Sequence, residues 1–145
     1  MMSISEIIEF IISYINNNYT IRSDKKLKLT FDELKPDKDS IMFSLADDNT
    51  VVEKKDITGI FVDGEISLQC YYRIMANDNG FADLDSIKVV DDLVSFIKSN
   101  YKSIKTDDFY VSGVVTKAST KLSAAYSNGA KDFISKFSIN YGRRL

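Results

Sequence analysis

The fold is decided by the closing stretch of the chain, Gly129-Ala-Lys-Asp-Phe133-Ile-Ser-Lys-Phe137-Ser-Ile139-Asn-Tyr141-Gly-Arg-Arg-Leu145. Successive side chains of an extended chain point to opposite sides. The large apolar ones here share one side: Phe133, Phe137, Ile139 and Tyr141. The polar ones share the other side: Lys136, Ser138 and Asn140. This period of two predicts a half-buried strand over Asp132–Tyr141, and we expect this end of the chain to be structural.

The composition is that of one folded domain. Of the 145 residues, 44% are hydrophobic and 28% are charged, so neither disorder nor a membrane protein is expected. The most apolar stretch, Ile4–Ile15, is too short and too polar to span a bilayer. It also lacks the basic start and small-residue cleavage site of a secretory signal. We expect a single domain over residues 1–145 in a cytoplasmic protein.

The charge balance argues against nucleic-acid binding. The net charge is −2 and the isoelectric point is near 5.2, so no dominant electrostatic hold on phosphates is expected. The short basic groups at 25–28 and 143–144 are expected to be solvated. The single cysteine, Cys70, excludes an internal disulfide, and it lies in an apolar row where we expect a small core residue.

Two helices are predicted. Ser3-x-x-Glu6 has the form of a capping box, and isoleucines then recur at helical spacing until the run Asn16–Asn18, where the helix should end. A second helix is predicted from about Leu84 to Asn100. Its broad apolar stripe indicates that it is covered on more than one side, and acids at its start and lysines at its end suit the helix dipole.

Alternating apolar residues predict strands over 27–31 and 41–45, with Lys35-Pro36-Asp37 between them. Asp63-Gly64 is a strong hairpin signal, and we expect a turn there between strands 57–62 and 65–75. The last two strands are predicted over Phe109–Lys117 and Asp132–Tyr141. Together these elements predict an α+β fold: a single, mostly antiparallel β-sheet with two main helices packed on one face.

The residue types needed for common catalysis are missing. The sequence has no histidine, which excludes Ser-His and Cys-His pairs, imidazole bases and the usual zinc sites. No glycine-rich phosphate loop is present. Asn77–Asp83 resembles the middle of a calcium loop, but Met75 and Ser86 stand where the anchoring carboxylates belong. We expect no catalytic residue, no cofactor and no metal, and we interpret this stretch as a strand-to-helix turn.

The remaining acids lie in predicted loops, mostly in pairs: Asp37, Asp39, Asp47, Asp48, Asp107 and Asp108. Paired carboxylates can perform acid–base chemistry or hold magnesium. Solvated loops are their more usual place, and nothing in the sequence brings the pairs together.

Some aromatic side chains fall outside the predicted core rows: Tyr71, Tyr110 and Tyr126. They could lie at a subunit interface or be partly buried at the sheet margin, and the sequence leaves both interpretations open. With the arginines near them in the chain or at its end, they form our candidate subunit or partner interface: Tyr71, Arg73, Tyr110, Tyr126, Arg143 and Arg144.

Three segments carry a resemblance to a known family: Gly64-Glu-Ile-Ser-Leu-Gln-Cys-Tyr-Tyr-Arg-Ile74, Ala82-Asp-Leu-Asp-Ser-Ile-Lys-Val-Val-Asp-Asp-Leu93 and the closing Gly129–Arg144. The chain resembles the tail terminator and minor capsid (neck) proteins of long-tailed bacteriophages and prophages. In these small α+β proteins a strand ending in Tyr-Arg precedes a helix, and the final strand ends in an aromatic-Tyr-Arg-like sequence. The resemblance extends over nearly the whole chain.

The resemblance implies a virion structural protein of the tail or neck, assembled in the cytoplasm of the host bacterium. Such a protein forms a ring, commonly a hexamer, on the last tail-tube ring, where it stops polymerisation and meets the head connector or stopper protein. A stopper or head-completion role is an alternative within the same group. Outside it, two alternatives are open: a module that binds a peptide or small ligand, and an enzyme that uses only carboxylates and lysine.

Overall fold

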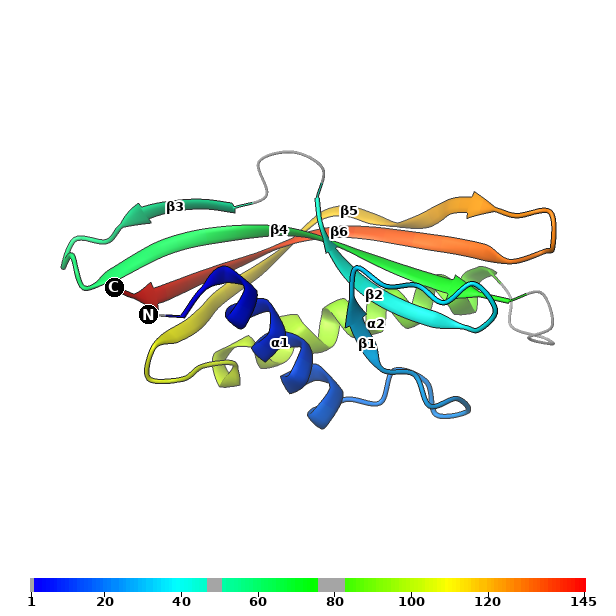
Figure 1. Cartoon of the computed structure of the whole chain (residues 1–145), viewed down its shortest axis with the longest axis horizontal. Coiled ribbons are helices and arrows are strands. Elements are labelled where there is room, and N and C mark those ends of the chain that lie inside the picture. The colour runs from blue at the N-terminus through cyan, green and yellow to red at the C-terminus, as the bar shows by residue number, and fades with distance from the viewer. Residues whose placement is uncertain (1, 47–50, 76–82) are drawn as a thin grey trace.

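The computed structural model describes residues 2–46, 51–75 and 83–145. In these ranges one six-stranded sheet lies over two helices (Figure 1). The elements follow in the order α1 (Ile4–Asn18), β1 (Leu29–Phe31), β2 (Ser40–Leu45), β3 (Val51–Lys55), β4 (Phe61–Ile74), α2 (Asp83–Asn100), the 3-10 turn η1 (Tyr101–Ser103), β5 (Phe109–Ala125) and β6 (Lys131–Arg144). Both predicted helices are confirmed.

Local sequence explains how α1 begins. Ser3 Oγ accepts a hydrogen bond from Glu6 N, and Glu6 Oε1 accepts one from Ser3 N, both at 3.1 Å, so the predicted capping box is present. The isoleucine stripe of α1 is buried under the sheet: Ile7, Ile8, Ile11, Ile12 and Ile15. No helix among the described residues is long and apolar enough to cross a membrane.

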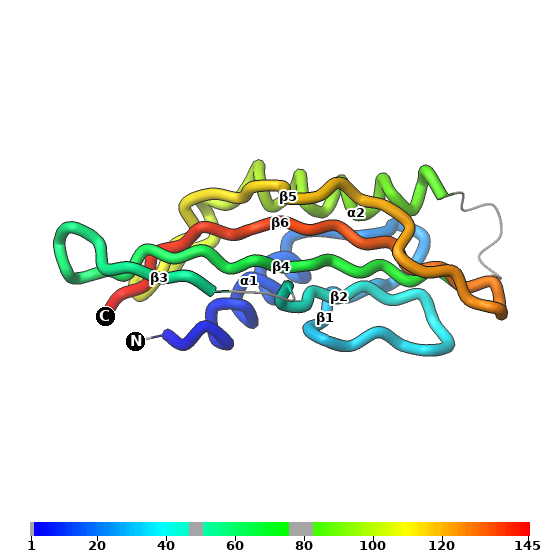
Figure 2. The backbone as a smooth tube through the Cα atoms, turned by 90° about the horizontal axis from the view of Figure 1, so that it is seen from above, coloured from blue at the N-terminus to red at the C-terminus, as the bar shows by residue number. Residues whose placement is uncertain are grey.

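The strands run in the order β1-β2-β4-β6-β5, and β3 pairs with β4 beyond the end of β2 (Figure 2). All pairs are antiparallel except β1 with β2, which is parallel. The predicted α+β class, with a mostly antiparallel sheet and both helices on one face, is therefore confirmed (Figure 1). The parallel pair was not predicted; residues 32–39 return the chain so that the three-residue strand β1 can lie beside β2.

Residues far apart in the sequence form the core between the sheet and the helices. The predicted apolar rows of β4 and β6 both face it: Ile66, Leu68, Cys70, Tyr72 and Ile74 from β4, and Phe133, Phe137, Ile139 and Tyr141 from β6. Helix α2 adds Val90, Leu93 and Ile97, each fully buried. Cys70 is a buried core residue, as predicted, and burial raises the pKa of its thiol well above the ordinary value.

The hairpin predicted at Asp63-Gly64 is wrong. Strand β4 runs straight through both residues, and the turn between β3 and β4 lies at residues 56–60. Gly64 serves a close approach instead: a Cβ atom there would lie 2.4 Å from Cζ of Tyr141 on the neighbouring strand β6. The glycine is needed because a neighbouring side chain packs against it. The sequence Asp-Gly by itself does not show whether a glycine is there for close packing or for a turn that requires positive φ.

We expect Gly64→Ala to lower the free energy of unfolding by about 1–3 kcal/mol, because the buried Tyr141 ring must move to admit the new methyl group. The matched control is Gly113→Ala in β5, where the nearest atom to a new Cβ is 3.7 Å away. Urea denaturation of the two variants checks the prediction. Equal free energies of unfolding for the two variants would show that the Tyr141 ring can move aside without loss of stability.

Strand β5 is longer than predicted, reaching Ala125 instead of Lys117. Its second half is mostly exposed, with Thr120 buried, and shows several register shifts against β6, so the sequence there has no apolar alternation. As a result the two hairpin turns of the sheet, at 56–60 and at 126–130, project at opposite ends of the molecule (Figures 1 and 2).

Candidate functional site

Within the described residues no helix or strand packs on the sheet face away from the two helices (Figure 1), and we call this face the open face. It carries the side chains that alternate with the core rows: Phe61, Asp63, Glu65, Ser67, Gln69, Tyr71 and Arg73 from β4, and Asp132, Ile134, Lys136, Ser138 and Asn140 from β6. Its middle combines polar side chains such as Ser67 and Lys136 with the larger Tyr71 and Ile134, and such a mixed surface suits contact with water or with another protein.

Near the turn between β5 and β6, at one end of the open face, a tight group is formed by Arg73, Tyr126 and Asp132. We call it the Arg73 cluster. Arg73 donates two hydrogen bonds to the Asp132 carboxylate, at 2.8 and 2.9 Å, and Tyr126 Oη donates another at 2.6 Å. The guanidinium also lies 5.2 Å from the centre of the Tyr126 ring. The hydrogen bond to Asp132 raises the pKa of Tyr126, and the cluster holds the ring in one place.

At the other end, Phe61, Tyr110 and Arg144 form a second aromatic group, the Tyr110 cluster. The two rings lie 5.6 Å apart between centres, and Arg144 lies 5.9 Å from the Phe61 ring. Tyr110 packs over Gly142, where a Cβ atom would come within 2.4 Å of the ring. Partial burial, together with the carboxylates of Asp63 and Asp56, raises the pKa of Tyr110.

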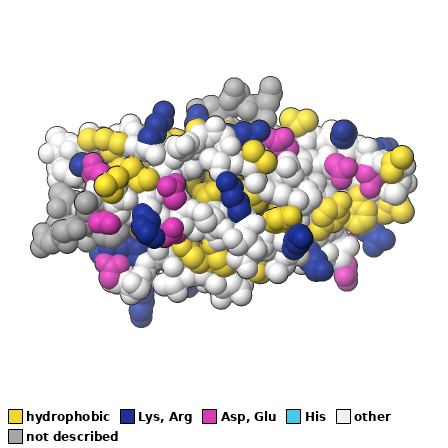
Figure 3. Space-filling view, turned by 180° about the vertical axis from the view of Figure 1, so that it is seen from behind, with side chains coloured by type: hydrophobic (Ala, Val, Ile, Leu, Met, Phe, Trp, Pro, Cys, Tyr) yellow, Lys and Arg dark blue, Asp and Glu magenta, His cyan; other side chains and the backbone are white. Residues whose placement is uncertain are grey.

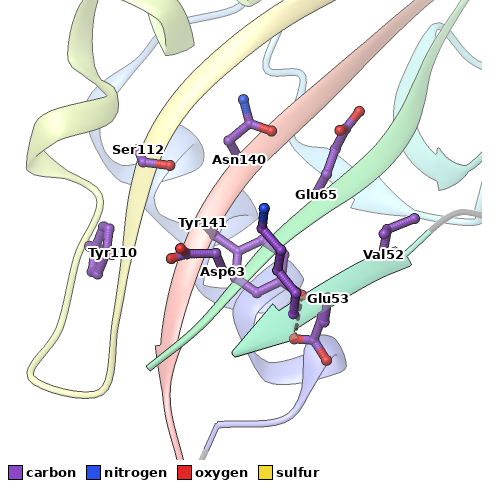
Figure 4. Close-up of a pocket in the computed structure, with 10 residues that line it drawn as sticks. Val52, Glu53, Asp63, Glu65, Tyr110, Ser112, Asn140 and Tyr141 are labelled. Carbon is purple, nitrogen blue, oxygen red and sulfur yellow. Dashed lines mark hydrogen bonds between the residues drawn. The ribbon is translucent and has the colours of Figure 1, made fainter. Parts of the chain in front are cut away.

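Beside the Tyr110 cluster lies an open groove of about 600 Å³ (Figure 4). Its lining comes from four strands: Val52, Glu53, Lys54, Asp63, Gly64, Glu65, Tyr110, Ser112, Asn140 and Tyr141. The groove carries charges of both signs, with Glu65 3.4 Å from Lys117 of β5. It is a wide surface depression that can accept part of another protein more readily than it can enclose a small substrate.

Arg143 does not lie with the other candidate residues. It alternates with Arg144 and lies on the helix side, where it donates to both carboxylate oxygens of Glu53 at 2.6 and 2.7 Å and to Met2 O at 3.0 Å. Tyr141 donates to the same carboxylate at 2.6 Å (Figure 4). The Arg143 hydrogen bond lowers the pKa of Glu53. The expectation that Arg143 is solvated is therefore corrected: the group ties β3 to β6 and to the start of the chain.

Tyr71 lies half-buried in the middle of the open face, in register with Met42 and Ile134. The exposed side chains of Tyr110 and Tyr126 lie towards opposite ends, at 37% and 44% exposure. Each of these two rings is also packed on a neighbour, which fits partial burial at the sheet margin, and the subunit interface stays a prediction. All the candidate residues except Arg143 are thus on or beside the open face.

The acidic residues that the structure describes, Asp37, Asp39, Asp107 and Asp108, do not gather into a site. Among the described residues no group of three or more metal-ligating side chains occurs. Asp47, Asp48 and most of the calcium-like stretch, residues 77–82, lie outside the described residues; Asp83 begins α2 and accepts a hydrogen bond from Lys131 at 2.9 Å. Asp39, expected in a solvated loop, is instead buried against Arg22 and Lys25.

Sequence reasoning missed two long-range ion pairs that were not expected at all, Arg22 with Asp39 and Arg143 with Glu53. Their partners are 17 and 90 residues apart in the sequence, and no spacing rule joins them. The only signal was the scarcity of arginine in a chain rich in lysine, because buried ion pairs favour the planar guanidinium.

The surface seen from behind carries lysine, arginine and acidic side chains interspersed over its described part (Figure 3). The chain matches no protein-family model, and no curated protein matches it at a significant level. The observations that bear on function are thus the sequence resemblance and the geometry of the open face.

Proposed function

We propose that this protein is a virion structural protein of a long-tailed bacteriophage or prophage, a tail terminator that caps the tail tube as a ring and forms part of the head–tail joint. The observation that carries the proposal is the placement of Tyr71, Arg73, Tyr110, Tyr126 and Arg144 along the open face. Aromatic and arginine side chains are enriched where proteins meet each other.

In this role the protein acts by contact and carries out no chemical step. The ring binds the last ring of tail-tube protein and presents no equivalent end to the next tube subunit, which stops growth. Its other side meets the head connector or stopper protein. The long central strands β4 and β6 form the structural support of the domain. The open face and the hairpin turns are the surfaces that contact the different partners.

One observation favours a second candidate, a peptide-binding module. The groove beside Tyr110 is lined by the short edge strand β3, and an extended peptide can add to such an edge. A monomeric protein that binds a peptide in this groove would support the module, whereas a protein active only in assembled particles supports the terminator.

The test is removal of the gene from a phage that carries it, followed by electron microscopy of the lysate. We expect filled heads separate from tails of uncontrolled length, because tube polymerisation then has no stop. Tails of normal length without heads would assign a stopper or head-completion role instead. Normal infectious particles would overturn the proposal.

A further inference from the structure

A depression of about 380 Å³ lies beside β1, at the edge of the sheet where β1 pairs with β2 (Figure 2). We call it the β1 depression. Lys26 and Lys28 in its wall are exposed, as predicted for the basic group at 25–28, and the fold brings a third exposed lysine, Lys35, to the same place. The complete lining is Lys26, Leu27, Lys28, Thr30, Glu33, Lys35, Asp39, Ser40 and Ile41.

The path of the chain around β1 explains why the lysines meet. Lys26 and Lys28 alternate with leucines that pack against the core, so both ammonium groups belong to the solvent side of this segment. Lys35 comes from the loop 32–39, which returns the chain for the parallel pairing of β1 with β2. Its backbone N–H donates to Ser40 Oγ at 3.0 Å, which ties the loop to the first residue of β2.

One of the two acids in the lining, Asp39, is already neutralised from within the protein. Its Oδ2 atom lies 3.1 Å from Arg22 Nη1 and 2.7 Å from Lys25 Nζ. Arg22 also pairs with Asp24, so two cations and two carboxylates balance in this group. The Asp39 side chain is 3% exposed. Asp39 therefore does not offset the charge of the lysines in the β1 depression.

The rest of the lining has an excess of positive charge. Three ammonium groups stand against the single free carboxylate of Glu33, which leaves two positive charges. Among the residues that the structure describes, neither Glu33 nor any of the three lysines forms an ion pair. Outside the lining, the same loop adds two acids and one lysine, and four lysines against three acids still leave an excess of one: Asp32, Asp37 and Lys38.

We propose that the β1 depression binds a phosphate group, as inorganic phosphate or as a small phosphate monoester. A phosphate monoester carries about −1.5 to −2 charges at neutral pH, which matches the two positive charges left in the lining. Its oxygens can accept hydrogen bonds from several lysines at once. Ser40 adds a buried hydroxyl, 8% exposed, whose hydrogen bond to Lys38 O is long, at 3.4 Å, so this hydroxyl can turn to the ligand. The site does not rest on the proposed function, because it uses none of the candidate interface residues.

The test is titration of the isotope-labelled protein with inorganic phosphate at constant ionic strength, followed by the backbone amide signals in NMR spectra. We expect saturable shifts for the amides of Lys28, Thr30 and Ser40, with a dissociation constant on the order of 1 mM, because contacts of exposed ammonium groups are individually weak. A second titration uses methyl phosphate: tighter binding than inorganic phosphate assigns the site to esters, and equal binding assigns it to the phosphate group alone. No shifts, or shifts over the whole surface without saturation, would overturn the proposal.

Matched variants separate a local site from the overall charge of the protein. Lys26→Gln/Lys28→Gln should weaken phosphate binding at least about tenfold, because two of the three lining cations are lost. Lys102→Gln/Lys105→Gln removes the same charge from exposed lysines outside the β1 depression and should change the affinity less than about twofold. Glu33→Gln should strengthen binding, because it removes the free carboxylate of the lining. Equal weakening by the two double variants would show attraction by net charge only and would overturn the proposal.

Discussion

Deleting residues 137–145 should unfold the protein. Strand β6 lies between β4 and β5, and Phe137, Ile139 and Tyr141 are almost completely buried on its helix side. Loss of one large core side chain typically costs about 2–5 kcal/mol, and whole domains are stable by only about 5–15 kcal/mol. The deletion removes three such side chains and half of a central strand, so the loss exceeds the stability available. Circular dichroism should show no cooperative melting transition.

The control for this deletion is removal of Leu145 alone. That residue is half-exposed and contributes one backbone hydrogen bond, to Ile60 O, so its loss should leave the melting temperature nearly unchanged. A longer deletion that melts like the wild type would show that β6 is peripheral to the core, contrary to its burial.

Arg22→Met should lower the free energy of unfolding by about 3–5 kcal/mol, because it leaves a buried carboxylate short of a cationic partner. The Arg22 guanidinium donates to Asp39 at 3.1 Å and to Tyr72 Oη at 2.8 Å, and it also pairs with Asp24. The side chains of Arg22 and Asp39 are 2% and 3% exposed, so water cannot replace the lost bonds. Urea denaturation with two-state analysis gives the difference.

Two further variants test the cause of that loss. Lys88→Met breaks an exposed pair with Asp92 on α2, and we expect a change of at most about 0.5 kcal/mol. The double variant Arg22→Met/Asp39→Asn removes the uncompensated charge and should regain part of the loss. A single variant Arg22→Met as stable as the wild type would mean that Lys25 and Met75 N, at 2.7 and 2.8 Å from the carboxylate, satisfy Asp39 by themselves.

The deletion of residues 137–145 and the substitution Arg22→Met differ in how much of the expected effect the sequence alone could predict. The strand period in residues 132–141 is enough to predict a buried β6 and hence the effect of deleting it. Nothing local marks Arg22 as buried, because its partner Asp39 lies beyond β1 and Tyr72 lies on β4. The candidate site divides in the same way: the aromatics outside the core rows were found by alternation, whereas the groove beside Tyr110 depends on the pairing of β3 with β4, and the sequence placed that hairpin wrongly.

The sequence by itself determined the elements whose causes are local. The capping box and isoleucine stripe define α1, and the alternating rows define the core sides of β4 and β6, because both depend on spacings within a few residues. Only the tertiary structure decided the role of Gly64, the full length of β5, the parallel pairing of β1 and the pairing of Arg143 with Glu53. For Gly64 and Arg143 the physical reason is that the deciding contact joins segments distant in the chain. The second half of β5 pairs with β6 across a short turn, but it is mostly exposed and so carries no apolar alternation. A glycine that admits a ring from the next strand has the same local sequence as one that makes a turn.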